Sequence, residues 1–329
     1  MENSHAIRTK KDPRLDQARD WLQTLDVDLQ SDFDDIAGDA SFRRYFRLQV
    51  DGKPRILMDD PPPGESVVPF MDVNQRLRSA NLHAPEIVHA DPQNGFLLLE
   101  DLGDSLYREL LNKDNVDEVF PELFDILKDM ALSADTRDLP LFDARKLRRD
   151  MDLFPEWYLG HHRKMMPRAQ LDLLWGDFCD QIIQSAQEQP QCFVHRDFHS
   201  CNLLKTNSSI GIIDFQDAVL GPVSYDFISL VWDRYINWPR EKIEKWMEVF
   251  RLKLGLEIEP RQWRRYCDLM GLQRNIKIVG IFARLHYRDG KTGYIEMIPR
   301  FFDYITSTLR LYPEFADVLE NLEHPECAP

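Results

Sequence analysis

Short apolar runs separated by turn signals dominate the first hundred residues of the chain. Apolar and aromatic residues alternate with polar ones over residues 41–50, and Asp51-Gly52 directly after them is a strong signal for a tight β-hairpin. We expect four strands and one helix here: strands at residues 41–50, 55–58, 86–90 and 96–100, and the helix at residues 67–81. The pattern predicts a small antiparallel sheet with one helix packed on it.

Helical spacing dominates after residue 100. Apolar residues recur three and four positions apart in five stretches: 117–133, 168–187, 241–254, 262–284 and 298–312. Residues 192–217 differ, because short apolar runs alternate there with polar loops, and loops on a rigid frame often carry catalytic groups. The chain is also too long for one ordinary core. We therefore predict an α+β protein with an N-terminal domain, residues 1–100, and a larger, mainly helical domain, residues 101–329.

Composition and charge exclude several classes of protein. The 329 residues carry a formal net charge of −15, which argues against a nucleic-acid binder because phosphate backbones select basic surfaces. The five cysteines include no C-x-x-C pair, so reduced thiols are expected rather than a zinc site or disulfides. Residues 1–15 lack a signal-peptide pattern, and no apolar run approaches the ~18 residues of a membrane span. We expect a cytoplasmic protein with no nucleic-acid, membrane or obligate protein partner.

One basic segment stands out in this acidic chain. Residues 261–300 contain nine Lys/Arg and three Asp/Glu, which gives a local charge of nine minus three, or +6. The segment is either a solvent-exposed helix face or a site for an anionic ligand.

The chemistry is concentrated in two motifs. Residues 195–202 read H-R-D-F-H-S-C-N and match the kinase catalytic-loop pattern H-R-D-x-x-x-x-N at each fixed position. Twelve residues after Asn202, Asp214-Phe215-Gln216 follows an apolar strand in the place of the metal-binding D-F-G turn, with Gln instead of Gly. In this pattern Asp197 accepts the proton of the acceptor hydroxyl, and Asn202 and Asp214 offer the hard oxygen ligands that Mg²⁺ prefers. Such residues also cap helices and close turns, but the spacing favours the catalytic interpretation.

Two further residues are expected to support this loop. His195 more often orients such a loop than reacts. Asp226, at the start of an apolar helix, is either a helix-start carboxylate or a buried partner that holds the catalytic loop, and the two roles are compatible.

At these motifs the chain resembles the superfamily of aminoglycoside phosphotransferases and choline kinases. The resemblance rests on V-H-R-D-F-H-S-C-N-L-L at 194–204, I-I-D-F-Q-D-A at 212–218 and G-P-V-S-Y-D-F-I-S-L at 221–230. Three other stretches, at 38–47, 58–62 and 280–291, resemble the bacterial anomeric kinases of N-acetylmuramate and N-acetylglucosamine in cell-wall (peptidoglycan) recycling. The resemblance implies a bilobal protein-kinase-like fold, with ATP and Mg²⁺ as cofactors and a small sugar as substrate.

The sequence departs from the usual kinase pattern where the nucleotide should bind. Residues 38–46 contain one glycine instead of a glycine-rich phosphate loop, and residues 55–58 carry no ATP-pairing lysine. We hypothesise that Arg43 or Arg44 neutralises the ATP phosphates instead, since arginine suits multidentate phosphate contacts. The alternative is that both are exposed strand arginines. By position, Glu100 to Leu102 would form the hinge that binds adenine through its backbone.

The motifs do not name the acceptor. N-acetylmuramate carries a carboxylate, which suits the basic segment, and Arg284, Tyr287 and Arg288 are the candidates for sugar contacts; an exposed basic helix end is the alternative. An aminoglycoside or amino alcohol as acceptor stays open, and so does a catalytically inactive pseudokinase that binds nucleotide, which only the missing lysine supports.

Overall fold

The structure is a computed structural model, and it describes residues 12–36, 43–62, 64, 66–165, 169–207, 209–233 and 235–323. The chain divides into two compact units. The first comprises Met1–Ser105 and Leu204–Gln216, and the second comprises Leu106–Leu203 and Asp217–Pro329. This differs from the contiguous division at residue 100 that the sequence predicts, because a segment from the middle of the chain returns to the first unit.

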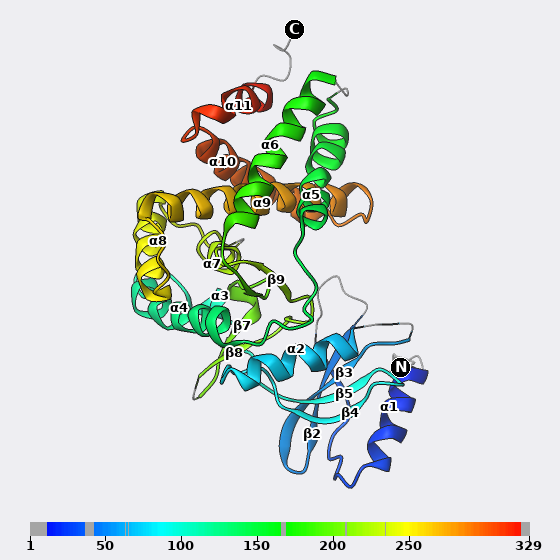
Figure 1. Cartoon of the computed structure of the whole chain (residues 1–329). Coiled ribbons are helices and arrows are strands. Elements are labelled where there is room, and N and C mark those ends of the chain that lie inside the picture. Colours follow the sequence, from blue (N-terminus) through cyan, green and yellow to red (C-terminus); the bar gives the residue numbers. More distant parts are fainter. Residues whose placement is uncertain are drawn as a thin grey trace. The chain divides into compact units, whose positions relative to one another are not determined.

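The first unit is built on a five-stranded antiparallel sheet (Figure 1). Its strands follow the order β1-β2-β3-β5-β4, with these bounds: β1 (Asp34–Ile36), β2 (Arg44–Val50), β3 (Lys53–Asp59), β4 (Ile87–Asp91) and β5 (Phe96–Glu100). Asp51 and Gly52 both have positive φ, at 52° and 70°, as the tight turn between β2 and β3 requires. The predicted small antiparallel sheet is confirmed, while β1 was not anticipated; residues 41 and 42 of the first expected strand lie outside the described residues.

Two helices belong to this unit. Helix α1 (Pro13–Thr24), which the sequence did not predict, packs Ala18 and Leu22 into the apolar core formed by residues of β2, β3 and β5. Helix α2 (Val67–Ser79) corresponds to the predicted helix and buries an apolar stripe that includes Phe70 and Leu77. Four consecutive residues of β5 are buried, so both faces of the sheet are covered at its centre.

The returning segment, residues 204–216, joins the first unit through specific contacts. It forms a hairpin of β7 (Leu203–Lys205) and β8 (Ile210–Ile212). The backbone N–H of Ile212 donates to the carbonyl of His83 at 2.9 Å, and the His83 ring hydrogen-bonds with the Ser209 hydroxyl at 2.7 Å. Gly211 leaves room for Leu102, since a Cβ atom there would lie 2.8 Å from Leu102 Cδ1.

The second unit is mainly helical, as expected (Figure 1). Its principal helices are α3 (Tyr107–Leu110), α4 (Val116–Ser133), α5 (Ala144–Leu153), the π-helix η1 (Phe154–His162), α6 (Ala169–Glu188), α7 (Tyr225–Val231), α8 (Arg240–Leu254), α9 (Pro260–Tyr287), α10 (Ile298–Leu309) and α11 (Ala316–Glu323). The five long helices predicted for this region are present as α4, α6, α8, α9 and α10, and the apolar helix expected to begin near Asp226 is α7. Helices α3, α5, η1 and α11 were not predicted. None of the helices in the described ranges is long and apolar enough to cross a membrane.

Helix α9 is the longest element and packs against α5, α6, α7, α8 and α10. It crosses the junction of α5 and η1 closely, because a Cβ atom on Gly280 would lie 2.5 Å from the backbone carbon of Leu153. A small antiparallel pair, β6 (Gln191–Val194) and β9 (Val219–Pro222), leads into the catalytic-loop sequence.

Candidate active site

The catalytic-loop sequence follows β6 in the second unit and is held by a buried carboxylate. One Asp226 oxygen accepts the backbone N–H of His195 at 2.6 Å, and the other accepts that of Arg196 at 3.0 Å. His195 is itself fully buried, and its Nδ1 accepts the backbone N–H of Asp197 at 3.3 Å. Asp226 thus stands in the first turn of α7 and also bonds the catalytic loop, so the structure contains both arrangements considered from the sequence.

Burial raises the pKa of Asp226 to about 7, although the two backbone hydrogen bonds act in the opposite direction. The backbone beside it is unusual as well. Arg196 has φ of +77°, a left-handed conformation that is uncommon for a residue other than glycine and is retained where the surroundings enforce it.

Asn202, the last residue of the motif, is hydrogen-bonded to Asp197. The Asn202 side-chain Nδ2 donates to the Asp197 carbonyl oxygen at 2.9 Å, which fixes the orientation of the amide and leaves its oxygen as the end that can bind a metal. The backbone N–H of Ser200 donates to Asp233 at 2.8 Å, so a second carboxylate anchors the loop.

Asp214 belongs to the first unit and is held between two side chains. Arg43 Nη2 donates to Asp214 Oδ1 at 3.2 Å, and Gln216 Nε2 donates to the same oxygen at 3.0 Å. The Asp214 side chain remains 44% exposed, while Phe215 beside it is buried against Phe70. The glutamine that replaces glycine in this motif therefore serves as a hydrogen-bond donor to the acidic residue. Within the described residues, no three His, Cys, Asp or Glu side chains gather as a ready-made metal site.

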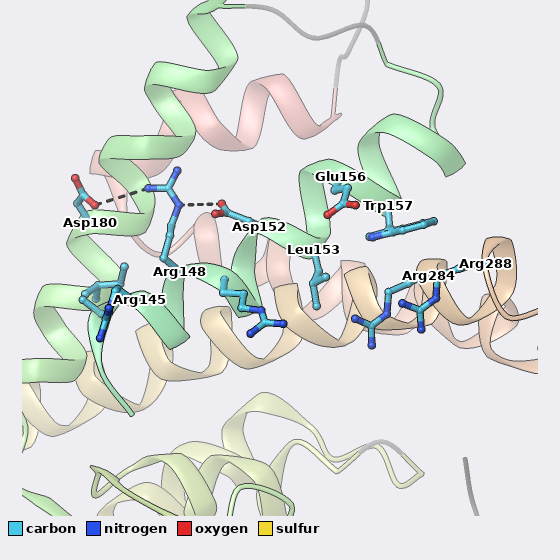
Figure 2. A pocket seen from close by; sticks show the side chains of 12 residues that line it. Arg145, Arg148, Asp152, Leu153, Glu156, Trp157, Asp180, Arg284 and Arg288 are labelled. Atoms are coloured by element: carbon cyan, nitrogen blue, oxygen red, sulfur yellow. Dashed lines mark hydrogen bonds and ion pairs between the residues drawn. The ribbon is translucent and has the colours of Figure 1, made fainter. Parts of the chain in front are cut away.

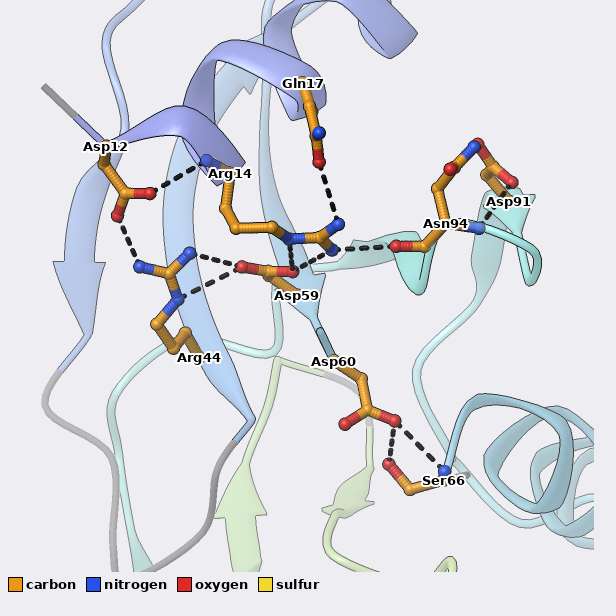
Figure 3. A network of polar contacts seen from close by, with 9 residues as sticks. All are labelled: Asp12, Arg14, Gln17, Arg44, Asp59, Asp60, Ser66, Asp91 and Asn94. Carbon is orange, nitrogen blue, oxygen red and sulfur yellow. Dashed lines mark hydrogen bonds and ion pairs between the residues drawn. The ribbon is translucent and has the colours of Figure 1, made fainter. Parts of the chain in front are cut away.

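Arg44, the second arginine of the hypothesis, is held in a polar network of the first unit (Figure 3). Its Nε donates to Asp59 Oδ2 at 3.1 Å, and it also pairs with Asp12. Arg14 of α1 donates to the other oxygen of Asp59, and the Asp59 carboxylate is fully buried. Arg44 is thus held by two carboxylates and is not an exposed strand arginine, whereas Arg43 is the arginine that bonds Asp214.

Of the two expected hinge residues, Glu100 ends β5 and Leu102 lies two residues beyond it. Glu100 accepts the backbone N–H of Glu86 at 3.0 Å and contacts the His83 ring at 3.2 Å. The Leu102 side chain packs on Gly211, as described above.

Arg284 and Arg288 line a groove of about 660 Å³ within the second unit (Figure 2). The groove is formed by α5, η1, α6 and α9, and Trp157 of η1 contributes an aromatic wall. Arg288 pairs with Asp289 at 2.7 Å, whereas Arg284 Nε is buried with no hydrogen-bond partner among the described residues.

Two further arginines of the groove differ in whether they are ion-paired, and Tyr287 lies apart from them. Arg148 is neutralised by Asp152 and Asp180, as the dashed lines in Figure 2 show. Arg149 also lines the groove and makes no ion pair with a described residue. Tyr287 lies outside the groove lining, where its hydroxyl hydrogen-bonds with His162 at 3.0 Å.

The sequence reasoning missed several groups near these elements. Arg149 and Trp157 lie on helical segments that were not predicted. The same is true of Asp150, which lies 3.5 Å from Lys277 of α9 and 3.7 Å from Arg196 of the catalytic loop. Lys277 was counted in the basic segment, but a charge count does not single out one lysine.

The model of the phosphotransferase enzyme family matches residues 32–266, more than half of the chain. The chain belongs to this family. A Pseudomonas putida protein named N-acetylmuramate/N-acetylglucosamine kinase is 39% identical over 325 residues, which cover 94% of this chain and 96% of the relative. A protein of the same name from Pseudomonas aeruginosa is 38% identical over 315 residues, covering 94% of this chain and 92% of the relative.

Solved structures show the fold of this phosphotransferase. Choline kinase LicA from Streptococcus pneumoniae matches with a TM-score of 0.64 at 11% identity, covering 90% of this chain and all (100%) of that one. An ADP-bound aminoglycoside phosphotransferase, APH(2'')-Ib, matches with a TM-score of 0.58 at 14% identity, covering 91% of this chain and 99% of that one. The expected bilobal, kinase-like α+β fold is confirmed. The protein is an enzyme, a phosphotransferase with an alcohol group as acceptor.

Proposed function

We propose that the protein transfers the γ-phosphoryl group of ATP to the anomeric (C1) hydroxyl of N-acetylmuramate, N-acetylglucosamine or both, in the cytoplasm and as part of peptidoglycan recycling. The observation that carries the proposal is the similarity to two relatives named for these sugars, at 39% and 38% identity over more than nine-tenths of the chain. The catalytic-loop residues that such a reaction needs are all in place in the sequence.

Asp197 is the base of the proposed reaction. It accepts the proton of the sugar hydroxyl as the oxygen attacks the γ-phosphorus, the bond from the γ-phosphorus to the β–γ bridging oxygen breaks and ADP leaves. The anomeric hydroxyl is more acidic than the other sugar hydroxyls, so a carboxylate is a sufficient base. Asp226 holds the loop backbone just before this residue, and His195 accepts the backbone N–H of Asp197 itself, which keeps the carboxylate in position.

Asn202 and Asp214 are the proposed Mg²⁺ ligands. Their oxygens fit the metal, since Asn202 has its amide nitrogen engaged and Asp214 remains partly exposed. The bound metal would neutralise charge on the ATP phosphates. Arg43 adds a guanidinium beside Asp214 for the same phosphates, and the backbone of Glu100 to Leu102 is the proposed adenine contact.

Arg284, Arg288 and Tyr287 remain the proposed acceptor contacts, with the carboxylate of N-acetylmuramate as the group that the arginines bind. The buried, unpartnered Nε of Arg284 supports this role, because a buried donor normally has a partner. Arg284→Ala should lower kcat/KM for N-acetylmuramate about tenfold and leave that for N-acetylglucosamine nearly unchanged. Arg137→Ala, which removes an exposed arginine paired with Asp135, is the control. Equal losses for both sugars would contradict the assignment.

The proposed function is tested by ADP release with Mg-ATP and four acceptors: N-acetylmuramate, N-acetylglucosamine, kanamycin and choline. Release with the N-acetyl sugars alone, lost in Asp197→Ala, would support the proposal, and phosphorus NMR would then locate the phosphate at C1. Release with kanamycin or choline alone would refute the acceptor. No release, with ATP still bound, would favour the inactive nucleotide-binding protein.

A further inference from the structure

Asp150 lies on α5 between two cations of the second unit. Its Oδ2 is 3.5 Å from the Lys277 ammonium on α9 and 3.7 Å from Arg196 Nη2 in the catalytic loop. Arg196 directly precedes the proposed base Asp197, and Asp197 also acts electrostatically on Lys277, so the cluster lies near the proposed base. Neither Asp150 nor Lys277 belongs to the catalytic-loop motif.

The cluster is incompletely hydrogen-bonded. Asp150 Oδ2 is buried and accepts no hydrogen bond from any described residue, and Arg196 Nε is buried without a partner in the same part of the chain. The separations from Asp150 to its two cations exceed the usual hydrogen-bond range of about 2.7–3.2 Å. Buried polar atoms in folded proteins nearly always have a partner. Asp150 therefore lies beside two cations with hydrogen-bonding capacity that the protein does not use.

A ligand can approach this cluster. The side chains of Asp150, Lys277 and Arg196 are 18%, 12% and 24% exposed, so a ligand can reach part of each, although Asp150 Oδ2 itself is buried. Lys277 is also charged at neutral pH: burial lowers its pKa, but Tyr225, Asp150 and Asp197 more than offset this, and the pKa ends above its ordinary value.

We propose that Asp150 and Lys277 form a subsite for one ring hydroxyl of the acceptor, other than the hydroxyl that is phosphorylated. This inference rests on the proposed sugar-kinase function. A hydroxyl is both a donor and an acceptor, so it can donate to the Asp150 carboxylate while its oxygen accepts from the Lys277 ammonium. An acceptor held here is fixed beside Asp197, and this positions its reacting hydroxyl.

The subsite is tested by pairing enzyme variants with sugars that lack single hydroxyls. We would measure kcat/KM for N-acetylglucosamine and its 3-, 4- and 6-deoxy analogues with the wild-type protein and with Asp150→Asn. One analogue should react roughly 10- to 100-fold more slowly than the parent sugar in the wild type, because a hydrogen bond to a charged group is lost. In Asp150→Asn the same analogue should lose less than about threefold, while the other two keep their wild-type ratios.

A merely structural role for Asp150 gives a different result. It would lower all four rates by one common factor and leave every deoxy ratio as in the wild type, which would overturn the proposal. Lys277→Gln provides a second variant, and calorimetric binding of each sugar to both variants replaces kinetics if turnover is too slow. The deoxy ratio at the same position should be reduced in both variants.

Asp268→Asn is the matched control. Asp268 is another buried carboxylate on α9, but it is fully paired, accepting from Arg240 at 2.6 and 2.9 Å. Its substitution should lower stability and leave all deoxy ratios unchanged. If the wild type phosphorylates no N-acetyl sugar, the proposed function fails and the subsite with it; if it does but no deoxy ratio changes in the variants, the subsite alone fails.

Discussion

Asp59 in the first unit and Asp150 in the second are both carboxylates between two cations, but their surroundings differ. Both oxygens of Asp59 accept hydrogen bonds, one from Arg14 and the other from Arg44, and its side chain is fully buried (Figure 3). Asp150 faces Lys277 and Arg196 at 3.5 and 3.7 Å, and its inner oxygen accepts no hydrogen bond from a described residue.

The comparison distinguishes the structural ion pair at Asp59 from the proposed ligand-binding carboxylate Asp150. Where arginine guanidinium groups donate hydrogen bonds directly to a carboxylate, its hydrogen-bonding capacity is used within the fold. A substrate can then gain little by binding to it. A carboxylate with cations nearby that do not hydrogen-bond to it is electrostatically stabilised, and its oxygens can still accept hydrogen bonds from a ligand. Such preorganisation is characteristic of groups that act on a ligand. We therefore expect substitutions of Asp59 to affect stability and substitutions of Asp150 to affect kinetics.

The largest effect is expected for Asp59→Asn. The change removes the charge between Arg14 and Arg44 and leaves their guanidiniums facing each other across a buried amide. Breaking a buried pair in this way should destabilise the first unit by about 3 kcal/mol. Hydrogen exchange measured by mass spectrometry should show faster exchange in β2 and β3, with α9 peptides of the second unit unchanged. Wild-type exchange in β2 and β3 would contradict the structural role of Asp59.

Asp226 provides a third case, a buried carboxylate with backbone donors. Burial raises its pKa to about 7, above the ordinary value of 3.8, so the native state holds a proton that the unfolded state has released. Its contribution to stability should therefore decline as pH rises from about 4 to about 7, by roughly 2–3 kcal/mol between about pH 5 and about pH 8. Urea unfolding of the wild type and Asp226→Asn at both pH values isolates the pH-dependent contribution of Asp226 to the free energy of unfolding. A stability difference that does not vary with pH would refute it.

The elements that the sequence predicted are those with a strong local signal. The Asp51-Gly52 turn, the alternating strands and the long amphipathic helices are set by neighbours along the chain, and the structure contains them. Helix α5 was missed because its sequence, ARKLRRDMDL, is mostly charged and only Leu147 and Met151 are buried. Helix α1 was missed for the same reason, since it too buries only two residues.

The residues of the candidate site also differ in whether a local sequence pattern marks them. Asp197, Asn202 and Asp214 lie in contiguous motifs with fixed spacing, so a sequence pattern can single them out as candidates. Asp150 and Lys277 meet only through the packing of α5 on α9, and no local pattern links residues so far apart. The roles of Arg43 and Arg44 were likewise indistinguishable in sequence, because their difference depends on the distant partners Asp214 and Asp59.

These two adjacent arginines make a third, smaller test. Arg44→Ala leaves Asp59 with Arg14 alone and should reduce stability by about 1–2 kcal/mol, with little effect on the KM for ATP. Arg43→Ala should do the opposite, raising the KM for ATP or lowering kcat about tenfold at nearly unchanged stability. Steady-state kinetics and thermal unfolding of the two variants decide the matter. If both variants leave ATP kinetics unchanged, another group neutralises the phosphates.

The smallest effect on stability is expected for Asp150→Asn. Since Asp150 Oδ2 makes no hydrogen bond to its cations, we expect this cluster to contribute less to folding than the directly hydrogen-bonded Asp59 network. Urea unfolding should show a change within about 1 kcal/mol, well below that of Asp59→Asn, while sugar kinetics change as described above. A loss of stability as large as that of Asp59→Asn would show that both carboxylates have the same structural role. The unbonded Oδ2 of Asp150 would then be a feature of the fold, because a carboxylate on which folding depends is already satisfied without a sugar.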